Sequence, residues 1–157
     1  MTKQPEQTPP AWKAGKRNYG TGLTLKTAKE MLEAGEREAE RQGVPMVIAI
    51  VDSGGHLLAF SRMDNALLAS ISIAMDKAFT AVFGKLPTTF PSADINPPFI
   101  HERWIRFPGG FPIIKNGVLL GGIGVSGGTI EDIFVAKAAL QAGGFSLDEV
   151  NAALTQG

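Results

Sequence analysis

The spacing of apolar positions changes along the chain, and these changes mark the expected elements. Between residues 25 and 42, apolar side chains such as Ala28 and Leu32 return every three to four positions, with charged residues between them. This spacing is typical of an amphipathic helix. Thr24 is placed to cap its first turn and Gly43 to end it.

The chain also holds two pairs of apolar stretches rich in β-branched residues, each pair separated by turn residues. They predict two β-hairpins, one over 46–51 and 56–62 and the other over 111–114 and 118–125. The second turn contains Asn116-Gly117, which is typical of a type I′ turn.

Residues 66–83 are apolar at almost every position, which predicts a helix that is largely buried. Asp64 stands where an N-cap is expected, and Gly84 where the helix should end. The informative polar residues of this helix fall within one side of it: Ser70, Lys77 and Thr80.

Two more helices are expected near the C-terminus. Thr129 is placed to cap one that ends at about Ala142, and Ser146 a short last one, in which Glu149 completes a capping-box pattern. Two hairpins without a βαβ rhythm predict an α+β fold, in which helices pack on a single antiparallel sheet. Residues 1–20 read as a flexible N-terminal arm, and residues 21–157 as a single domain.

Residues 85–108 follow no regular pattern. They contain five prolines, which exclude long regular structure, yet they are too rich in apolar and aromatic residues for a solvated loop. A loop of this length is usually functional or buried in an interface. We expect it to close over a ligand held between subunits.

Composition narrows the function classes. The chain has 157 residues, with 15 basic and 15 acidic side chains and no net charge, which argues against a nucleic-acid partner. The absence of cysteine excludes disulfides and thiolate metal sites. No apolar run reaches the length of a membrane span, and the polar first 20 residues show no export signal, so we expect a cytoplasmic protein without a membrane partner.

Two known motifs match the glycine-rich stretch at 122–128, and both fail on context. Residues 122–127 match the dinucleotide fingerprint, but no second strand with an acidic ribose ligand follows. The segment around Ser126 also matches a nucleophile elbow, which requires a later histidine, and no histidine occurs beyond His101. A cradle for a ligand and a tight strand-to-helix turn are the two interpretations left open, and Glu131 and Asp132 in the following first turn would repel an anion.

Three side chains are candidates for acid–base or catalytic chemistry: His56, His101 and Lys77. Either histidine could ligate a metal, and each could equally be a surface residue. Lys77 could pair with a nearby carboxylate or face the negative group of a ligand. The residues expected to frame a ligand or cofactor are Asp52, His56, Arg62, Asp64, Lys77, Gly109, Gly110, Ser126 and Gly127.

Four segments together resemble the GlcG/HbpS-like haem-binding family, in the order of that family: IVDSGGHLLAFSRMD (50–64), DKAFTA (76–81), GGFPI (109–113) and GGIGVSGG (121–128). The resemblance implies a profilin-like, roughly five-stranded antiparallel sheet flanked by helices, and assembly into homo-oligomers. It also implies haem binding or haem degradation, and a likeness to the C-terminal domains of PduO-type corrinoid adenosyltransferases. Haem-binding relatives can use a histidine early in the first helix. Residues 24–42 contain none, so haem would need His56 or His101 as its axial ligand.

Three classes of function follow. The protein binds or degrades haem, or it is an accessory enzyme or binder for a small carbonyl or carboxylate metabolite, or it is an oligomeric interaction module without a ligand. The classes differ in whether catalysis occurs, and the residues alone do not decide between them.

Overall fold

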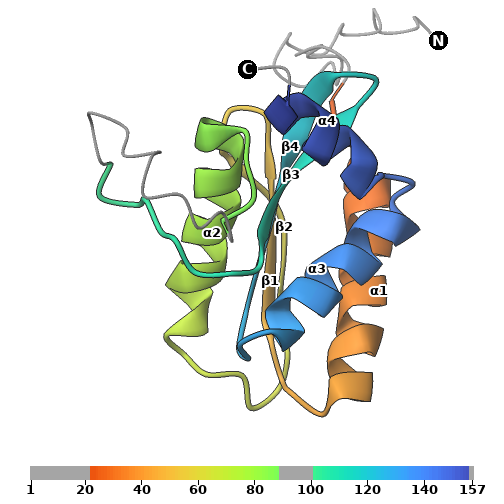
Figure 1. Ribbon diagram of the computed structural model, residues 1–157. Helices are drawn as coiled ribbons and strands as arrows, with labels where there is room; N and C mark the ends of the chain where they lie inside the picture. Colours follow the sequence, from red (N-terminus) through yellow and green to blue (C-terminus); the bar gives the residue numbers. More distant parts are fainter. Residues whose placement is uncertain (1–21, 89–100, 156–157) are drawn as a thin grey trace, which may run out of the picture.

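The computed structural model describes residues 22–88 and 101–155, and within them the chain forms an α+β fold around one antiparallel sheet (Figure 1). The strand order is β2-β1-β4-β3. We expected roughly five strands, and the described residues form a sheet of four. Their bounds are Val47–Asp52 for β1, Leu57–Arg62 for β2, Gly110–Lys115 for β3 and Val118–Ser126 for β4.

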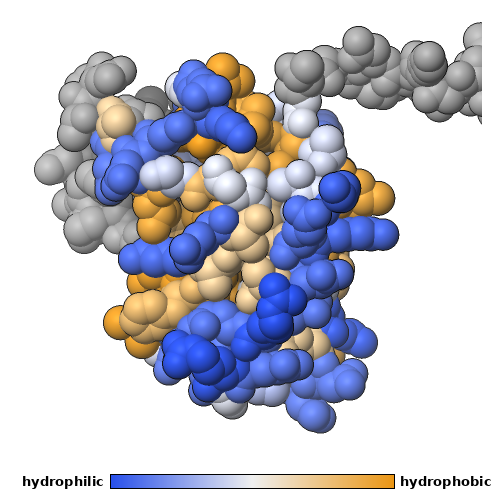
Figure 2. Space-filling model, turned by 90° about the vertical axis from the view of Figure 1, so that its right-hand side faces the viewer, coloured by the Kyte–Doolittle hydropathy of each residue, from blue (hydrophilic) through white to orange (hydrophobic). Residues whose placement is uncertain are grey.

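Helices cover both faces of the sheet. Figure 1 shows α2 (Ser70–Gly84) on one face and the pair α1 (Leu25–Gln42) and α3 (Glu131–Ala142) on the other, while α4 (Leu147–Thr155) lies beside β3. Figure 2 views the side of α1 and α3, where hydrophilic side chains cover much of the surface. This arrangement confirms the predicted order of elements.

The central strand β1 is buried on both sides, which explains its unbroken apolar sequence. Ile48 and Ile50 pack into the main core beneath α1 and α3. Val47 and Ala49 face the opposite way and pack with Ala74 of α2. Successive side chains of β1 point to opposite faces of the sheet, and both faces pack into a hydrophobic core. Neither face of this strand is exposed to solvent.

Glycines in β4 allow α2 to lie unusually close to the sheet. A Cβ atom on Gly124 would lie 1.9 Å from the carbonyl oxygen of Ala74, and one on Gly122 would lie 2.6 Å from that of Ala78. Both distances are shorter than any real contact, so only glycine fits. The glycine-rich stretch that resembled a nucleotide motif thus serves, in this part, to pack a helix on a strand.

Several predicted ends are confirmed. The Thr24 hydroxyl accepts a hydrogen bond from the Thr27 amide at 3.1 Å, and Gly43 ends α1 with a φ of 72°. Asn116 and Gly117 both have positive φ, as a type I′ turn requires.

Other predicted ends are wrong. The helix expected from residue 66 begins at Ser70, and Asp64 does not cap it, since its N-cap is Ala69 without a side-chain bond. Leu67 and Leu68 lie outside the helix and are exposed.

The third helix begins at Glu131 after Ile130, so Thr129 does not cap it either. Ser146 does accept the Asp148 amide at 3.1 Å, as an N-cap should, and the Oε2 atom of Glu149 is buried without a hydrogen-bond partner. The expected arm (1–20) and most of the apolar part of the 85–108 loop lie outside the described residues.

Candidate functional site

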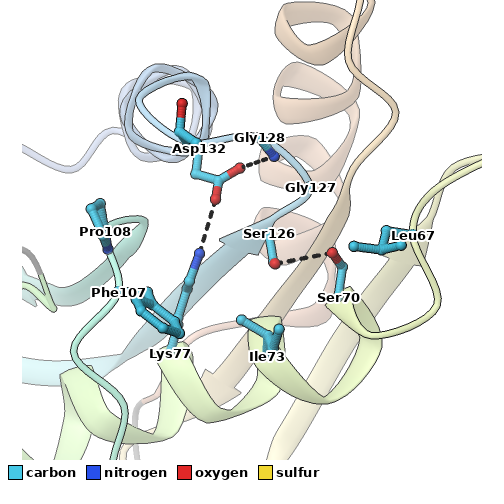
Figure 3. A pocket seen from close by; sticks show the side chains of 11 residues that line it. Leu67, Ser70, Ile73, Lys77, Phe107, Pro108, Ser126, Gly127, Gly128 and Asp132 are labelled. Atoms are coloured by element: carbon cyan, nitrogen blue, oxygen red, sulfur yellow. Dashed lines mark hydrogen bonds and ion pairs between the residues drawn. The ribbon is translucent and has the colours of Figure 1, made fainter.

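Lys77 lies in the middle of α2 and is only 2% exposed. Its Nζ atom donates one hydrogen bond to the carbonyl oxygen of Val125 at 2.6 Å and another to Oδ2 of Asp132 at 2.9 Å (Figure 3). The side chain therefore joins α2 to the end of β4 and the start of α3. The ion-pair interpretation of Lys77 is the one that the structure shows.

Burial dominates the electrostatics of this pair. It lowers the pKa of the Lys77 ammonium, because the charged form loses hydration, and the nearby Asp132 carboxylate opposes this effect. Asp132 is equally buried, and its other oxygen, Oδ1, accepts the Gly128 amide at 2.8 Å. The lysine and the carboxylate together carry no net charge.

The two acidic residues in the first turn of α3 hold backbone amides of the preceding β4–α3 turn. Asp132 holds the Gly128 amide, and Glu131 Oε2 accepts the Thr129 amide at 2.9 Å. The hydrogen bond from the Thr129 backbone lowers the pKa of the Glu131 carboxyl, so this residue keeps its negative charge. These two hydrogen bonds take up amides that an anionic ligand would otherwise use.

A cavity of about 270 Å³, which we call the Lys77 cavity, opens between α2 and the β4–α3 turn (Figure 3). On one wall the hydroxyls of Ser70 and Ser126 are hydrogen-bonded to each other at 3.0 Å. The lining residues are Leu67, Ser70, Ile73, Lys77, Phe107, Pro108, Ser126, Gly127, Gly128, Thr129 and Asp132.

The structure brings part of the predicted ligand set together at this cavity. Lys77, Ser126 and Gly127 line it. Gly109 borders Lys77, since with its φ of 113° a Cβ atom there would lie 3.2 Å from the lysine Nζ. Gly110 is held behind it by its amide, which donates to the Thr88 hydroxyl at 2.8 Å.

The other predicted ligand residues lie elsewhere. Arg62 and Asp64 line a separate hollow together with Glu36 and Glu40 of α1. Asp52 Oδ1 accepts the amides of Gly54 and His56, both at 2.9 Å, and so closes the β1–β2 turn. Asp52 therefore stabilises the β1–β2 turn. None of the three residues Arg62, Asp64 and Asp52 lines the Lys77 cavity.

Sequence reasoning noticed Asp132 only as an acid that would repel anions, and it missed the contact with Lys77. The two residues are 55 positions apart, and no spacing rule links them. The signal that could have suggested the contact is the lysine itself, because a cation on a buried helix needs a partner.

His101 lies at the other end of α2, in an aromatic cluster. The rings of Phe79 and Phe83 stack with centroids 4.2 Å apart, and the His101 ring is 5.0 Å from that of Phe79. The Arg103 guanidinium lies 4.2 Å over the Phe79 ring and pairs with Asp76 at 2.8 Å. Gly55, next to the exposed His56, borders the same rings, since a Cβ atom on it would lie 3.2 Å from Phe79 and 3.5 Å from Phe83.

These two places fit haem to different degrees. The Lys77 cavity contains no histidine that could ligate the iron. Its volume is also below the range of roughly 300–1,000 Å³ for drug-sized ligands, and a porphyrin is at the large end of that class. The aromatic cluster offers an imidazole, two rings and a guanidinium. However, Nδ1 of His101 accepts the Arg103 amide at 3.1 Å, so the neutral ring carries its proton on Nε2, the nitrogen left for a metal. Haem does not fit the cavity, and at the cluster His101 would have to change its hydrogen bonding.

The described residues contain neither a helix that could cross a membrane nor a cluster of metal ligands. No helix within 22–88 and 101–155 is both long and apolar enough to cross a membrane. In the same residues, no three histidine, cysteine or acidic side chains gather in a way that could hold a metal ion.

Comparison with known proteins gives consistent relatives. An uncharacterized 15.0 kDa protein from the dhaT-dhaS intergenic region of Citrobacter freundii is 38% identical over 75% of this chain and 89% of its own length. The GlcG protein of Escherichia coli K12 is 36% identical over 66% of this chain and 81% of its own. The corrinoid adenosyltransferase PduO of Citrobacter freundii is 33% identical over 80% of this chain, but only 40% of PduO is matched.

Solved structures agree with the fold. The Klebsiella pneumoniae protein ORFY superposes with a TM-score of 0.72 at 32% identity, covering 82% of this chain and 96% of ORFY. A structure described as a PduOC:heme complex superposes with a TM-score of 0.71 at 31% identity, covering 78% of this chain and 95% of that one.

The family described as haem-degrading HbpS-like proteins matches residues 23–141, which include every strand and the three longer helices apart from one terminal residue of α3. This confirms the resemblance found in the sequence. The chain belongs to the HbpS-like family.

Proposed function

We propose that this protein binds a small, uncharged metabolite that carries a carbonyl or hydroxyl group, and that the ligand occupies the Lys77 cavity. The observation that carries the proposal is the set of polar groups in an otherwise apolar hollow: the Lys77–Asp132 pair and the Ser70–Ser126 pair. A few polar groups in an apolar concavity are typical of a small-molecule site.

The charges of the site favour a neutral ligand over a carboxylate. Asp132 already neutralises Lys77, and the amides of Gly128 and Thr129 are held by the acids of α3. A carboxylate would meet the negative side chain of Asp132, whose positive partner Lys77 is already paired, at this end of the cavity. Of the carbonyl and carboxylate ligands considered from the sequence, the geometry supports the carbonyl class.

A three-carbon series of equal size tests this proposal: propanal, 1-propanol and propionate, each added to the full chain while Tm is recorded. We expect propanal and 1-propanol to raise Tm and propionate to have no effect, because a ligand that binds only the folded state stabilises it. Ile73→Trp should fill the cavity and abolish the shift. Ser72→Trp, at an exposed neighbouring position of α2, is the matched control and should keep it. A larger shift with propionate, or a full shift in Ile73→Trp, would contradict the proposal.

Haem is the second candidate ligand. It is supported by the relative whose structure is described as a heme complex and by the contact of His101 with Phe79 beside Arg103. If haem binds here, His101 would hold the iron and Phe83, which is 59% exposed, would contact the ring.

An absorbance titration with haemin tests this second candidate. We expect a saturable Soret shift that is lost in His101→Ala and kept in His56→Ala, since the His56 ring is not among the ring contacts of the cluster within the described residues. Slow loss of the Soret band with a reductant present would indicate haem degradation. A shift that ignores both substitutions would contradict His101 as the ligand.

Assembly into a homo-oligomer in the cytoplasm also stays a prediction. Two large apolar side chains at the Lys77 cavity, Leu67 and Phe107, are 64% and 61% exposed, which favours burial against a second copy. An interaction module without a ligand would form the same oligomer but show no Tm shift with any probe of the series.

A further inference from the structure

We propose that the Lys77 amine condenses reversibly with the aldehyde group of a small metabolite in the Lys77 cavity, forming an imine. The inference rests on the proposed function. It goes further because it names aldehydes as the ligand class and the Nζ atom of Lys77 as the atom to which they bond.

The geometry leaves this amine accessible at one point. An ammonium group has three N–H bonds, and in the described structure two of them are taken by Val125 and Asp132. The third has no such partner, and Lys77 is part of the cavity wall. Gly109 keeps this region open, because a Cβ atom there would lie 3.2 Å from Nζ.

The neighbouring groups supply what imine formation needs. Asp132 Oδ2, 2.9 Å from Nζ, can take one proton from the ammonium, and the free amine then attacks the carbonyl carbon. Asp132 returns the proton to the hydroxyl of the resulting carbinolamine, which leaves as water. The balance is ammonium plus aldehyde giving protonated imine plus water, with no oxidant or reductant.

The serine pair can orient the aldehyde. The hydroxyls of Ser70 and Ser126 carry two protons, of which their mutual hydrogen bond uses one. The other proton can be donated to the carbonyl oxygen in the cavity. This polarises the carbonyl group toward attack by Lys77.

Lys77 differs from the surface lysines in its hydration. Lys26 and Lys137 are exposed to water, whereas the Lys77 side chain is buried. Burial shifts the Lys77 amine toward its neutral, nucleophilic form. We therefore expect an aldehyde to modify Lys77 in preference to the exposed lysines.

Reductive trapping on the full chain tests the inference. The protein is incubated at neutral pH with increasing propanal and sodium cyanoborohydride, and the propylated lysines are identified by peptide mass spectrometry. We expect propylation of Lys77 to saturate with propanal, and that of Lys26 and Lys137 to rise slowly and linearly. Propylation of the exposed lysines without any at Lys77 would overturn the inference.

Lys77→Arg provides a conservative variant, because a guanidinium keeps the charge and can donate to Asp132 but forms no imine under these conditions. It should form no adduct at position 77 and should lose the part of the propanal Tm shift that exceeds the shift with 1-propanol. If this variant does not fold, the pattern of propylated lysines in the wild-type protein still tests the inference. Equal Tm shifts with propanal and 1-propanol but no Lys77 adduct would leave the cavity as a binding site and refute the imine. No shift with either probe and no adduct would refute both.

Discussion

The Lys77–Asp132 contact shows how much a single buried pair depends on both of its members. Each side chain is about 3% exposed, so neither charge can recover its hydration if the other is removed. Replacing one partner therefore differs sharply from replacing both.

Lys77→Met should lower the free energy of unfolding by about 3–5 kcal/mol, because it leaves the Asp132 carboxylate buried without a counter-charge. The double variant Lys77→Met/Asp132→Leu should recover most of this loss. Urea unfolding followed by circular dichroism measures both. A double variant no more stable than the single one would show that the pair matters through its hydrogen bonds to Val125 and Gly128 rather than through its charges.

The same pair predicts a pH dependence. Because burial lowers the pKa of Lys77 below its ordinary 10.5, the unfolded chain binds more protons than the folded one between the two values. The free energy of unfolding contributed by Lys77 should therefore rise with pH in the window below 10.5, and the rise should be absent from Lys77→Met/Asp132→Leu. Asp132 and Glu131 are the acidic groups of α3 nearest this site, and the hydrogen bond from the Thr129 backbone lowers the pKa of Glu131, so Glu131 does not titrate in that window. A fall with pH in the wild type relative to the double variant would mean that the ion pair outweighs burial.

At the scale of elements, backbone contact between α2 and β4 positions the Lys77 cavity. The helix lies so close to the strand that Gly124 contacts the backbone of Ala74 and Ala78. Any Cβ atom at this position pushes the helix, and Lys77 with it, away from the sheet.

Gly124→Ala should destabilise the protein by about 1–3 kcal/mol or more, the usual range for forcing extra atoms into a packed interior. Gly22→Ala is the control, because a Cβ atom on Gly22 meets nothing within 4 Å. Thermal and urea unfolding of the two variants give the comparison. Equal stabilities would show that α2 can move away from β4 at no cost.

The helix caps give a second prediction at this scale. Thr24→Ala should cost about 1 kcal/mol of unfolding free energy, because the hydroxyl accepts the Thr27 amide at the start of α1. Thr129→Ala should change stability by less than about 0.5 kcal/mol, since this exposed residue does not cap α3. A larger loss from Thr129→Ala would contradict the assignment of the α3 N-terminus to the side chains of Glu131 and Asp132.

At the scale of the whole molecule, the exposed apolar side chains beside the Lys77 cavity connect binding with assembly. If Leu67 and Phe107 meet a second copy of the chain, that copy covers the mouth of the cavity. Light scattering coupled to size-exclusion chromatography should then show an oligomer for the wild type and a smaller species for Leu67→Ser/Phe107→Ser. Phe134→Ser, also at an exposed apolar residue but outside the cavity lining, is the control and should leave the mass unchanged. A wild-type monomer would contradict the expected assembly.

The sequence by itself determined the order of elements, because the information is local. The return of Ala28 and Leu32 at helical spacing, the unbroken apolar run of β1 and the Asn116-Gly117 turn each identify their element without reference to the rest of the chain. The quoted segments likewise sufficed to identify the family, and two of their glycines, Gly122 and Gly124, are required by backbone packing. The start of α2 was misplaced, because Leu67 and Leu68 are apolar and yet exposed.

Only the tertiary structure decided which chemical groups meet. Lys77 and Asp132 are 55 residues apart, and Ser70 and Ser126 are 56 apart, so both contacts exist only once α2 has packed on β4. Arg62, Asp64, Asp52 and His56 were equally plausible as ligands in the sequence, but the same packing places them at other edges of the sheet. A local pattern fixes which residue types are near one another along the chain. The site depends on long-range contacts, which are determined by how whole elements fit together.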